Sequence, residues 1–429
     1  MGASLGIRIR SKKMIKTHHL SCYLLIFSGI LSVNAVGAEL KGHLKGQYQY
    51  APVSDQSLAS ALDESDLNEA LIDFRLMGEY GRGNWQLQAH YQLKALVGNG
   101  VSYRNQLYSR FPALAPPNNQ WFDLSNTLAS SQNSQWVHGL DRLILRYTSE
   151  QLVIKLGRQA LSWGNGLVFR PMDLFNPFSP YEVDTSYKPG TDMLYGQWLM
   201  PSGSDISLIG VPRRGADRGA LDSQQSSGAI KWHYFGARVQ GDLMLARDYG
   251  DAVLGLGLNG PLADAVWRMD LVPVYLRGGG SRSSLVINIE QAWQWSGRNI
   301  SGFAEYYRNG FGLGAKNYTL QDLPPELSER LARGQLFNTG RDYLATGARI
   351  QTSELLQMMP SLMFNLNDQS LLLFVQGLYS VSQNINLDFG LLAGMGGRGS
   401  EFGGLQTSPG SGIYVRLVNR LYARLSWYF

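Results

Sequence analysis

Charged side chains recur at regular intervals in segments whose other positions are apolar. The last segment is the clearest case, because Arg416, Arg420 and Arg424 stand four residues apart and share one face of an extended chain. Same-face positions four residues apart in a strand are separated by about 13 Å. A row of guanidinium groups along the wall of a water-filled channel would attract anions. The same arginines could instead pair with carboxylates and stiffen the wall, and the sequence leaves both interpretations open.

The same alternation in other segments predicts a mainly cationic wet face. The acidic candidates for this face are Asp73, Glu79, Asp242, Asp270 and Glu290. The basic candidates are Arg75, Lys94, Arg142, Arg146, Lys155, Lys231, Arg268, Arg349, Arg416, Arg420 and Arg424. Since the basic candidates outnumber the acidic ones, we expect a wet interior that prefers anions.

Catalytic and metal chemistry receive little support from the residue types. The histidines beyond the N-terminal leader stand at positions 43, 90, 138 and 233, and no nucleophile motif flanks any of them. The only cysteine, Cys22, lies in the N-terminal apolar run, which leaves no cysteine for a disulfide or a metal site in the rest of the chain. We therefore expect no enzyme activity, no cofactor and no metal.

The elements that position these residues are predicted to be strands. Ile72, Phe74 and Leu76 alternate with charged residues before the turn at 81–84, and the same period of two continues in 85–94. This alternation indicates strands with one apolar and one wet face, and neither run has the spacing of a helix.

Eighteen such segments can be traced, an even number, as a closed bacterial barrel requires. We therefore predict an all-β fold, a transmembrane antiparallel β-barrel of about 18 strands, within a range of about 14 to 18. The predicted strands are 41–52, 70–80, 85–96, 137–148, 151–159, 191–199, 203–211, 228–235, 238–248, 251–259, 264–275, 283–294, 299–309, 342–352, 357–366, 371–380, 384–394 and 411–429. Short turns alternate with longer connections, of which 97–136, 160–190 and 310–341 are expected to be long extracellular loops.

Both ends of the chain suggest export to an outer membrane. Residues 1–38 combine a basic start, the apolar run Leu20–Val33 and small residues up to Ala38, which predicts a cleaved signal peptide followed by a single barrel over 39–429. At the C-terminus, Leu425, Trp427 and Phe429 share one face, a pattern typical of the signal that the barrel-assembly machinery reads.

The excess of basic residues belongs to this leader. The chain has 38 Lys and Arg against 33 Asp and Glu, and the five basic residues of the leader account for the whole difference. A balanced remainder argues against nucleic acid as a partner.

The segments 156–164 (LGRQALSWG) and 170–177 (RPMDLFNP) resemble alginate-export-type porins and related proteobacterial outer-membrane barrels. So do 247–251 (RDYGD), 253–257 (VLGLG) and 265–268 (AVWR). The resemblance implies an outer-membrane channel of eighteen strands, while barrels with these motifs carry different cargo.

The connection 160–190 has prolines at 171, 177, 180 and 189, which exclude it from a central strand. We expect an ordered loop that folds over or into the mouth of the barrel, with Trp163, Arg170, Asp173 and Phe175 as its candidate functional residues. An ordinary surface loop is the alternative.

These observations predict an outer-membrane channel of a Gram-negative bacterium, a porin or exporter for a hydrophilic, anionic solute or polymer. The expected partners are outer-membrane lipid, the assembly machinery and a small solute or polysaccharide. The alternative is a lipid-handling or surface-interaction barrel with an occluded lumen. The sequence leaves the cargo, the direction of transport and the oligomeric state open.

Overall fold

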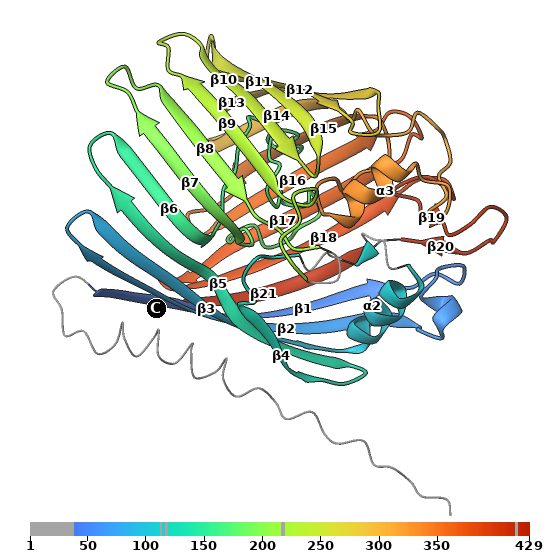
Figure 1. Ribbon diagram of the computed structural model, residues 1–429. Helices are drawn as coiled ribbons and strands as arrows, with labels where there is room; N and C mark the ends of the chain where they lie inside the picture. Colours follow the sequence, from blue (N-terminus) through green and yellow to red (C-terminus); the bar gives the residue numbers. More distant parts are fainter. Residues whose placement is uncertain (1–37, 112–113, 116–118, 216–218, 417–418) are drawn as a thin grey trace, which may run out of the picture.

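The computed structural model describes residues 38–111, 114–115, 119–215, 219–416 and 419–429 (Figure 1). Eighteen antiparallel strands form one closed ring, in which each strand is hydrogen-bonded to the next. The last strand, β21 (Arg420–Tyr428), pairs with β18 (Ile385–Met395) on one side and with β1 (Ala38–Pro52) on the other, and these pairings close the barrel. The predicted signal peptide lies outside the described residues, apart from Ala38.

The bounds of the strands follow the predicted alternation closely. The remaining ring strands are β2 (Asp66–Arg82), β3 (Trp85–Val97), β5 (Ser134–Thr148), β6 (Leu152–Gln159), β7 (Thr191–Leu199), β8 (Asp205–Val211), β9 (Ser227–Tyr234), β10 (Gln240–Asp248), β11 (Asp251–Leu262), β12 (Ala265–Tyr275), β13 (Ser281–Trp295), β14 (Arg298–Arg308), β15 (Asp342–Gln351), β16 (Leu356–Asn365) and β17 (Leu371–Ser382). The prediction of an all-β barrel of about 18 strands is confirmed.

Four short elements in the loops, β4, α2, α3 and η1, were not predicted. The strand β4 (Ser125–Ser130) pairs with the first half of β5 and lies outside the ring. The helices α2 (Asn99–Arg110) and α3 (Pro325–Ala332) lie in the long loops, and the 3-10 turn η1 spans Ser60–Leu62. None of the described helices is long and apolar enough to cross a membrane.

The predicted last strand, 411–429, is wrong in its first half. Tyr414–Val415 (β20) pairs with Leu405–Gln406 (β19) in a separate two-stranded sheet, and the ring strand begins only at Arg420. Val415 is buried against Leu58 and Leu107 in the loops. Its apolar character therefore reflects packing within the loops rather than a lipid-facing position.

The two faces of the barrel differ in polarity. Large apolar side chains are exposed on the exterior of strand after strand, among them Leu145, Leu208, Leu245 and Trp427. Closure satisfies the backbone hydrogen bonds, and an apolar exterior suits the hydrocarbon of a bilayer. The protein is therefore a membrane-spanning β-barrel of the outer-membrane type.

Candidate functional site

The connection between β6 and β7, residues 160–190, lies inside the barrel. It contacts β12 and β14 on one wall and β1 and β21 on the opposite wall, so it crosses the lumen (Figure 1). We call this segment the lumen loop, its residues 163–169 the first arm, and its residues 178–187 the second arm.

Buried carboxylates fix the first arm to the wall. Glu305 on β14 accepts hydrogen bonds from the backbone N–H groups of Leu167 at 2.6 Å, Val168 at 3.0 Å and Phe169 at 2.8 Å. Asp270 on β12 accepts from the backbone N–H of Asn165 at 2.6 Å. Hydrogen bonds to a charged acceptor are stronger than neutral ones, so these carboxylates hold the backbone of the first arm in one position.

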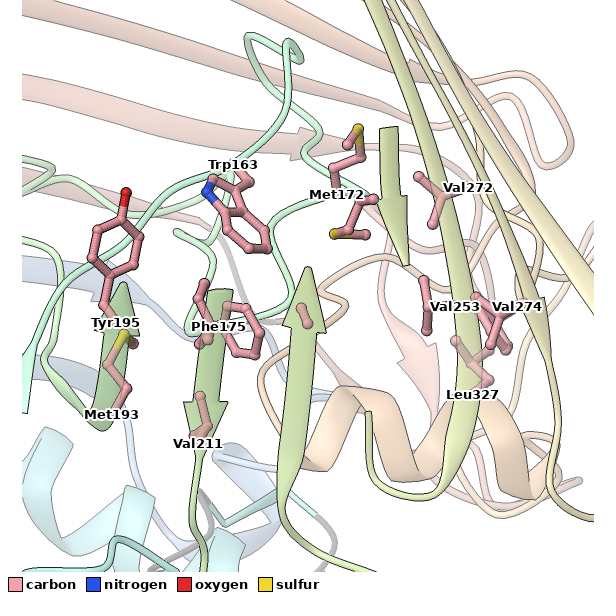
Figure 2. Close-up of a cluster of buried hydrophobic side chains, with 14 residues drawn as sticks. Trp163, Met172, Phe175, Met193, Tyr195, Val211, Val253, Val272, Val274 and Leu327 are labelled. Atoms are coloured by element: carbon pink, nitrogen blue, oxygen red, sulfur yellow. The ribbon is translucent and has the colours of Figure 1, made fainter. Parts of the chain in front are cut away.

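Apolar packing continues from this contact. Trp163 and Phe175, from the lumen loop, pack edge to face at 5.9 Å and lie in a buried cluster with side chains of the wall, as Figure 2 shows. Met172 is fully buried in the same cluster. The cluster includes Met193 and Tyr195 of β7, so the loop fills the side of the lumen that faces β7 to β12.

A buried ion pair closes the base of the loop. The Lys188 ammonium donates to both carboxylate oxygens of Asp173, at 2.7 and 2.6 Å, and to the Ser162 hydroxyl at 3.0 Å. Burial raises the pKa of Asp173 despite the nearby Lys188, and burial lowers the pKa of Lys188. The ionised form of each side chain therefore depends on its partner, because either charge alone would be costly to bury inside the barrel.

The second arm is held by charged groups of the opposite wall. The Lys45 ammonium on β1 contacts Asp184 at 2.6 Å, and Arg424 on β21 approaches the same carboxylate at 3.5 Å. Arg420 donates to the backbone carbonyl of Tyr181. The second arm thus depends on ion pairs, whereas the first arm depends on its own backbone N–H groups.

The structure places the predicted basic residues other than Arg416 inside the barrel, but carboxylates pair with five of them. Arg75 and Arg142 both pair with Asp141, at 2.6 and 2.7 Å. The other pairs are Lys231 with Asp242 at 2.9 Å, Arg268 with Glu290 at 2.9 Å, and Arg424 with Asp388 at 3.3 Å. A cation paired in this way contributes little to the field in the lumen.

The remaining predicted cations form no ion pair among the described residues. Arg146 donates to the side chain of Gln86 at 3.2 Å, and the Lys155 ammonium lies 5.1 Å from the centre of the Tyr195 ring. Lys94 and Arg349 are exposed inside the barrel. Together with Arg420, which bonds to a backbone carbonyl of the lumen loop, these four side chains supply the uncompensated positive charge of the wall.

Arg416 does not continue the row of Arg420 and Arg424, contrary to the prediction. It lies before the ring strand begins, is exposed, and donates from Nε to the carbonyl of Gly403 at 2.8 Å. The predicted arginine row is therefore interrupted, and its two remaining members contact the lumen loop rather than open water.

Two cavities remain beside the lumen loop. The one nearer the long loops has a volume of 710 Å³ and is lined by Lys94 and Asp184, among others. The other, of 470 Å³, lies against β13 to β17 and is lined by Arg170 and Arg349. Both are lined by Phe178, Ser179 and Glu182, so the second arm separates one cavity from the other.

Several residues of the site were not predicted. Lys45, Asp388 and Glu305 stand on inward positions of strands that alternation located, so the same parity argument could have found them. Asp141 stands where the β3–β5 register shifts, and Asp184 stands in a loop, so strand parity indicates neither. Within the described ranges no group of three or more His, Cys, Asp or Glu residues is arranged to hold a metal ion.

Solved porins share this architecture. The chain aligns with OccAB4 of Acinetobacter baumannii at a TM-score of 0.55 and 10% identity, over 92% of this chain and 99% of that one. A BenF-like porin from Pseudomonas fluorescens aligns at a TM-score of 0.51 and 10% identity, over 91% of this chain and 98% of that one. OpdQ of Pseudomonas aeruginosa aligns at a TM-score of 0.50 and 10% identity, over 91% of this chain and 98% of that one.

No family model matches the sequence, and no curated protein matches it either. At such low identity the likeness concerns the fold, which is that of the outer-membrane porins. Within that class the particular features of this chain are its lumen loop, fixed at opposite walls, and the two cavities that the second arm separates.

Proposed function

We propose that this protein is an outer-membrane channel that passes small hydrophilic solutes and prefers anions. One observation carries the proposal: two cavities with mixed polar and apolar walls meet at the second arm, and unpaired cations stand on the path that they define. Lys94 faces the first cavity, and Arg170 and Arg349 face the second. Because long loops of such barrels face the exterior, the larger cavity is the external one.

The size of the cavities favours a small solute over a polymer. Their volumes, 710 and 470 Å³, are those of sites for single small molecules, in the range of about 300 to 1,000 Å³. A polysaccharide would need a continuous wide passage, which the lumen loop interrupts. The resemblance of residues 156–177 to alginate-export-type porins remains an interpretation of those residues.

Reversal potentials in a planar bilayer test the proposal. In a salt gradient, we expect the wild-type channel to prefer anions modestly, and most clearly in dilute salt, because screening over about 10 Å at 0.1 M weakens fixed charges. The variant K94Q/R349Q should lose much of this preference. R416Q is the matched control, since it removes a cation that lies outside the lumen.

Each outcome has a definite meaning. A wild-type channel that prefers cations would contradict the anion preference. A folded barrel that never conducts would contradict the channel itself and favour a surface-interaction barrel, in which the lumen loop and its apolar cluster close the lumen.

A further inference from the structure

Asp184 of the second arm occupies a built anion site on the barrel wall. Its cationic partners, Lys45 and Arg424, have side chains that are only 3% and 5% exposed, whereas the side chain of Asp184 is 27% exposed. The cations therefore belong to the interior of the wall, and the carboxylate reaches them from the loop.

The wall offers more donors than Asp184 uses. Nη1 of Arg424 approaches Asp184 at 3.5 Å without forming a hydrogen bond, and neither this atom nor the buried hydroxyl of Tyr422 has a hydrogen-bond partner among the described residues. Tyr422 and Arg424 stand two residues apart on the same face of β21. Buried donors without partners are costly, so a larger oxyanion could satisfy this site better than the single carboxylate of Asp184.

The site can be reached from the external cavity, because Asp184 and Tyr187 line that cavity. Burial alone would raise the pKa of Asp184, but Arg424 and Lys45 hold the pKa below its ordinary value. Asp184 therefore competes for the cations as a charged group at any ordinary pH.

Besides the Asp184 ion pairs, the second arm has apolar and polar contacts: Val183 and Tyr181 pack in a buried cluster, and the Arg75 guanidinium lies 4.5 Å from the centre of the Tyr187 ring. Arg420 donates to the carbonyl of Tyr181, the Tyr181 hydroxyl lies 2.7 Å from Asn338 Nδ2, and the Tyr187 hydroxyl donates to Met77 Sδ at 3.4 Å. Glu182 and Thr185 are exposed. Loss of the Asp184 contact would thus remove the only ion pairs that the second arm forms with the described wall residues, and would loosen the segment that separates the two cavities.

We propose that Asp184 is a displaceable latch: an oxyanion group of the solute, a carboxylate or a phosphate, replaces Asp184 at Lys45 and Arg424 and loosens the second arm. This inference rests on the proposed function, because it assigns the solute group that opens the path between the cavities. Solute binding and opening would then be the same event.

The variant D184N removes the competing charge, and E182Q is its matched control. Both variants remove one carboxylate from the same arm, but Glu182 forms no ion pair among the described residues. A ligand that must displace the latch binds with an apparent Kd equal to its intrinsic Kd divided by the fraction of channels whose latch is open. Removing the latch therefore tightens binding by the inverse of that fraction, here about tenfold for a partly buried pair. Succinate and inorganic phosphate are the two probes, and they distinguish carboxylate from phosphate recognition.

The first measurement is block of the potassium chloride current in a planar bilayer. We expect D184N to lower the half-blocking concentration of succinate or phosphate about tenfold, E182Q to leave it within about twofold, and K45Q/D184N to abolish the gain. An equal shift in D184N and E182Q would show a general charge effect and overturn the latch, as would no shift in D184N.

The second measurement does not depend on conduction. In detergent-solubilised wild-type barrel, saturating succinate or phosphate should speed hydrogen exchange in residues 178–187 and leave residues 163–169 unchanged. If exchange in 178–187 does not rise with either probe, the latch is wrong. A barrel that fails to conduct but shows this exchange response would overturn the channel and leave the oxyanion-displaced latch in place.

Discussion

The anchoring of the first arm by Glu305 yields the sharpest quantitative prediction. The Glu305 side chain is fully buried, and its Oε1 accepts from Val168 and Phe169 while its Oε2 accepts from Leu167 and Asn288. In E305Q an NH2 group replaces one of these oxygens. This NH2 group can only donate, so it would face two other donors. At least two charge-assisted hydrogen bonds are lost, each worth about 1.5 to 3 kcal/mol, or about 3 to 6 kcal/mol together.

The assay is hydrogen exchange of the backbone amides of residues 167–169. A loss of about 3 to 6 kcal/mol in the free energy of local opening corresponds to exchange that is about 160-fold to 25,000-fold faster. Detachment of the first arm should also raise single-channel conductance and its noise. Heat-modifiable migration on a gel verifies that the barrel itself still forms.

E290Q is the matched control for this variant. Glu290 stands on β13, faces the same lumen and carries the same charge, but its carboxylate bonds to Arg268 at 2.9 Å and to Ser301 at 3.3 Å rather than to the lumen loop. It should alter selectivity and leave exchange at 167–169 unchanged. If E305Q leaves that exchange at the wild-type rate, then carboxylate anchoring is not what positions the arm.

Three further predictions concern the closure of the barrel between β1 and β21, the base of the lumen loop, and the outer loops. G42V should reduce the heat-modifiable barrel on gels, because a Cβ at Gly42 would lie 2.4 Å from the Phe429 ring, whereas G46V should not, because nothing lies within 4 Å there. K188M should destabilise the lumen loop by about 3 to 5 kcal/mol by leaving Asp173 buried without its cation, measured as faster exchange over residues 160–190, and D173L/K188M should recover most of the loss. Burial raises the pKa of Glu401 from 4.5 to about 7. Between these pH values the Glu401 carboxyl keeps its proton while the loops are closed and loses it when they open. Raising the pH from about 4.5 through 7 should therefore speed proteolysis of loops 309–341 and 396–404, and E401Q should remove this pH dependence.

Alternation predicts strands well because period two is a local property of the sequence. Ring strands such as β7 and β5 were located to within a few residues, since their lipid-facing side chains and turns are encoded in place. The same rule failed at Ile413–Arg416, where apolar residues at alternate positions serve a loop cluster. Alternation identifies a buried face, but it cannot tell lipid from the packed interior of a loop.

The lumen loop could not be positioned from sequence because its partners are remote. Leu167 meets Glu305 across 138 residues, and Lys45 meets Asp184 across 139. Prolines indicate that the segment is no strand, but only the closed ring brings β14 and β1 to opposite sides of it. Trp163 and Phe175, predicted at the mouth, are buried in the wall cluster for the same reason.

Pairing, rather than the number of cations, decides the field that a solute meets. Arg75, Arg142, Lys231, Arg268 and Arg424 face carboxylates, so their charge is largely cancelled where they stand. The uncompensated cations lie on both sides of the second arm. Lys94 lies on the external side, and Arg349 lines the second cavity, while Arg146 and Lys155 are cross-strand neighbours beside the short turn that joins β5 to β6. On the proposed function, an anion would be attracted from either cavity toward the second arm, which is itself held by the carboxylate of Asp184. A channel built in this way would have no net charge and still favour anions, because its carboxylates hold the lumen loop, through ion pairs or backbone N–H groups, while its unpaired cations face the solute.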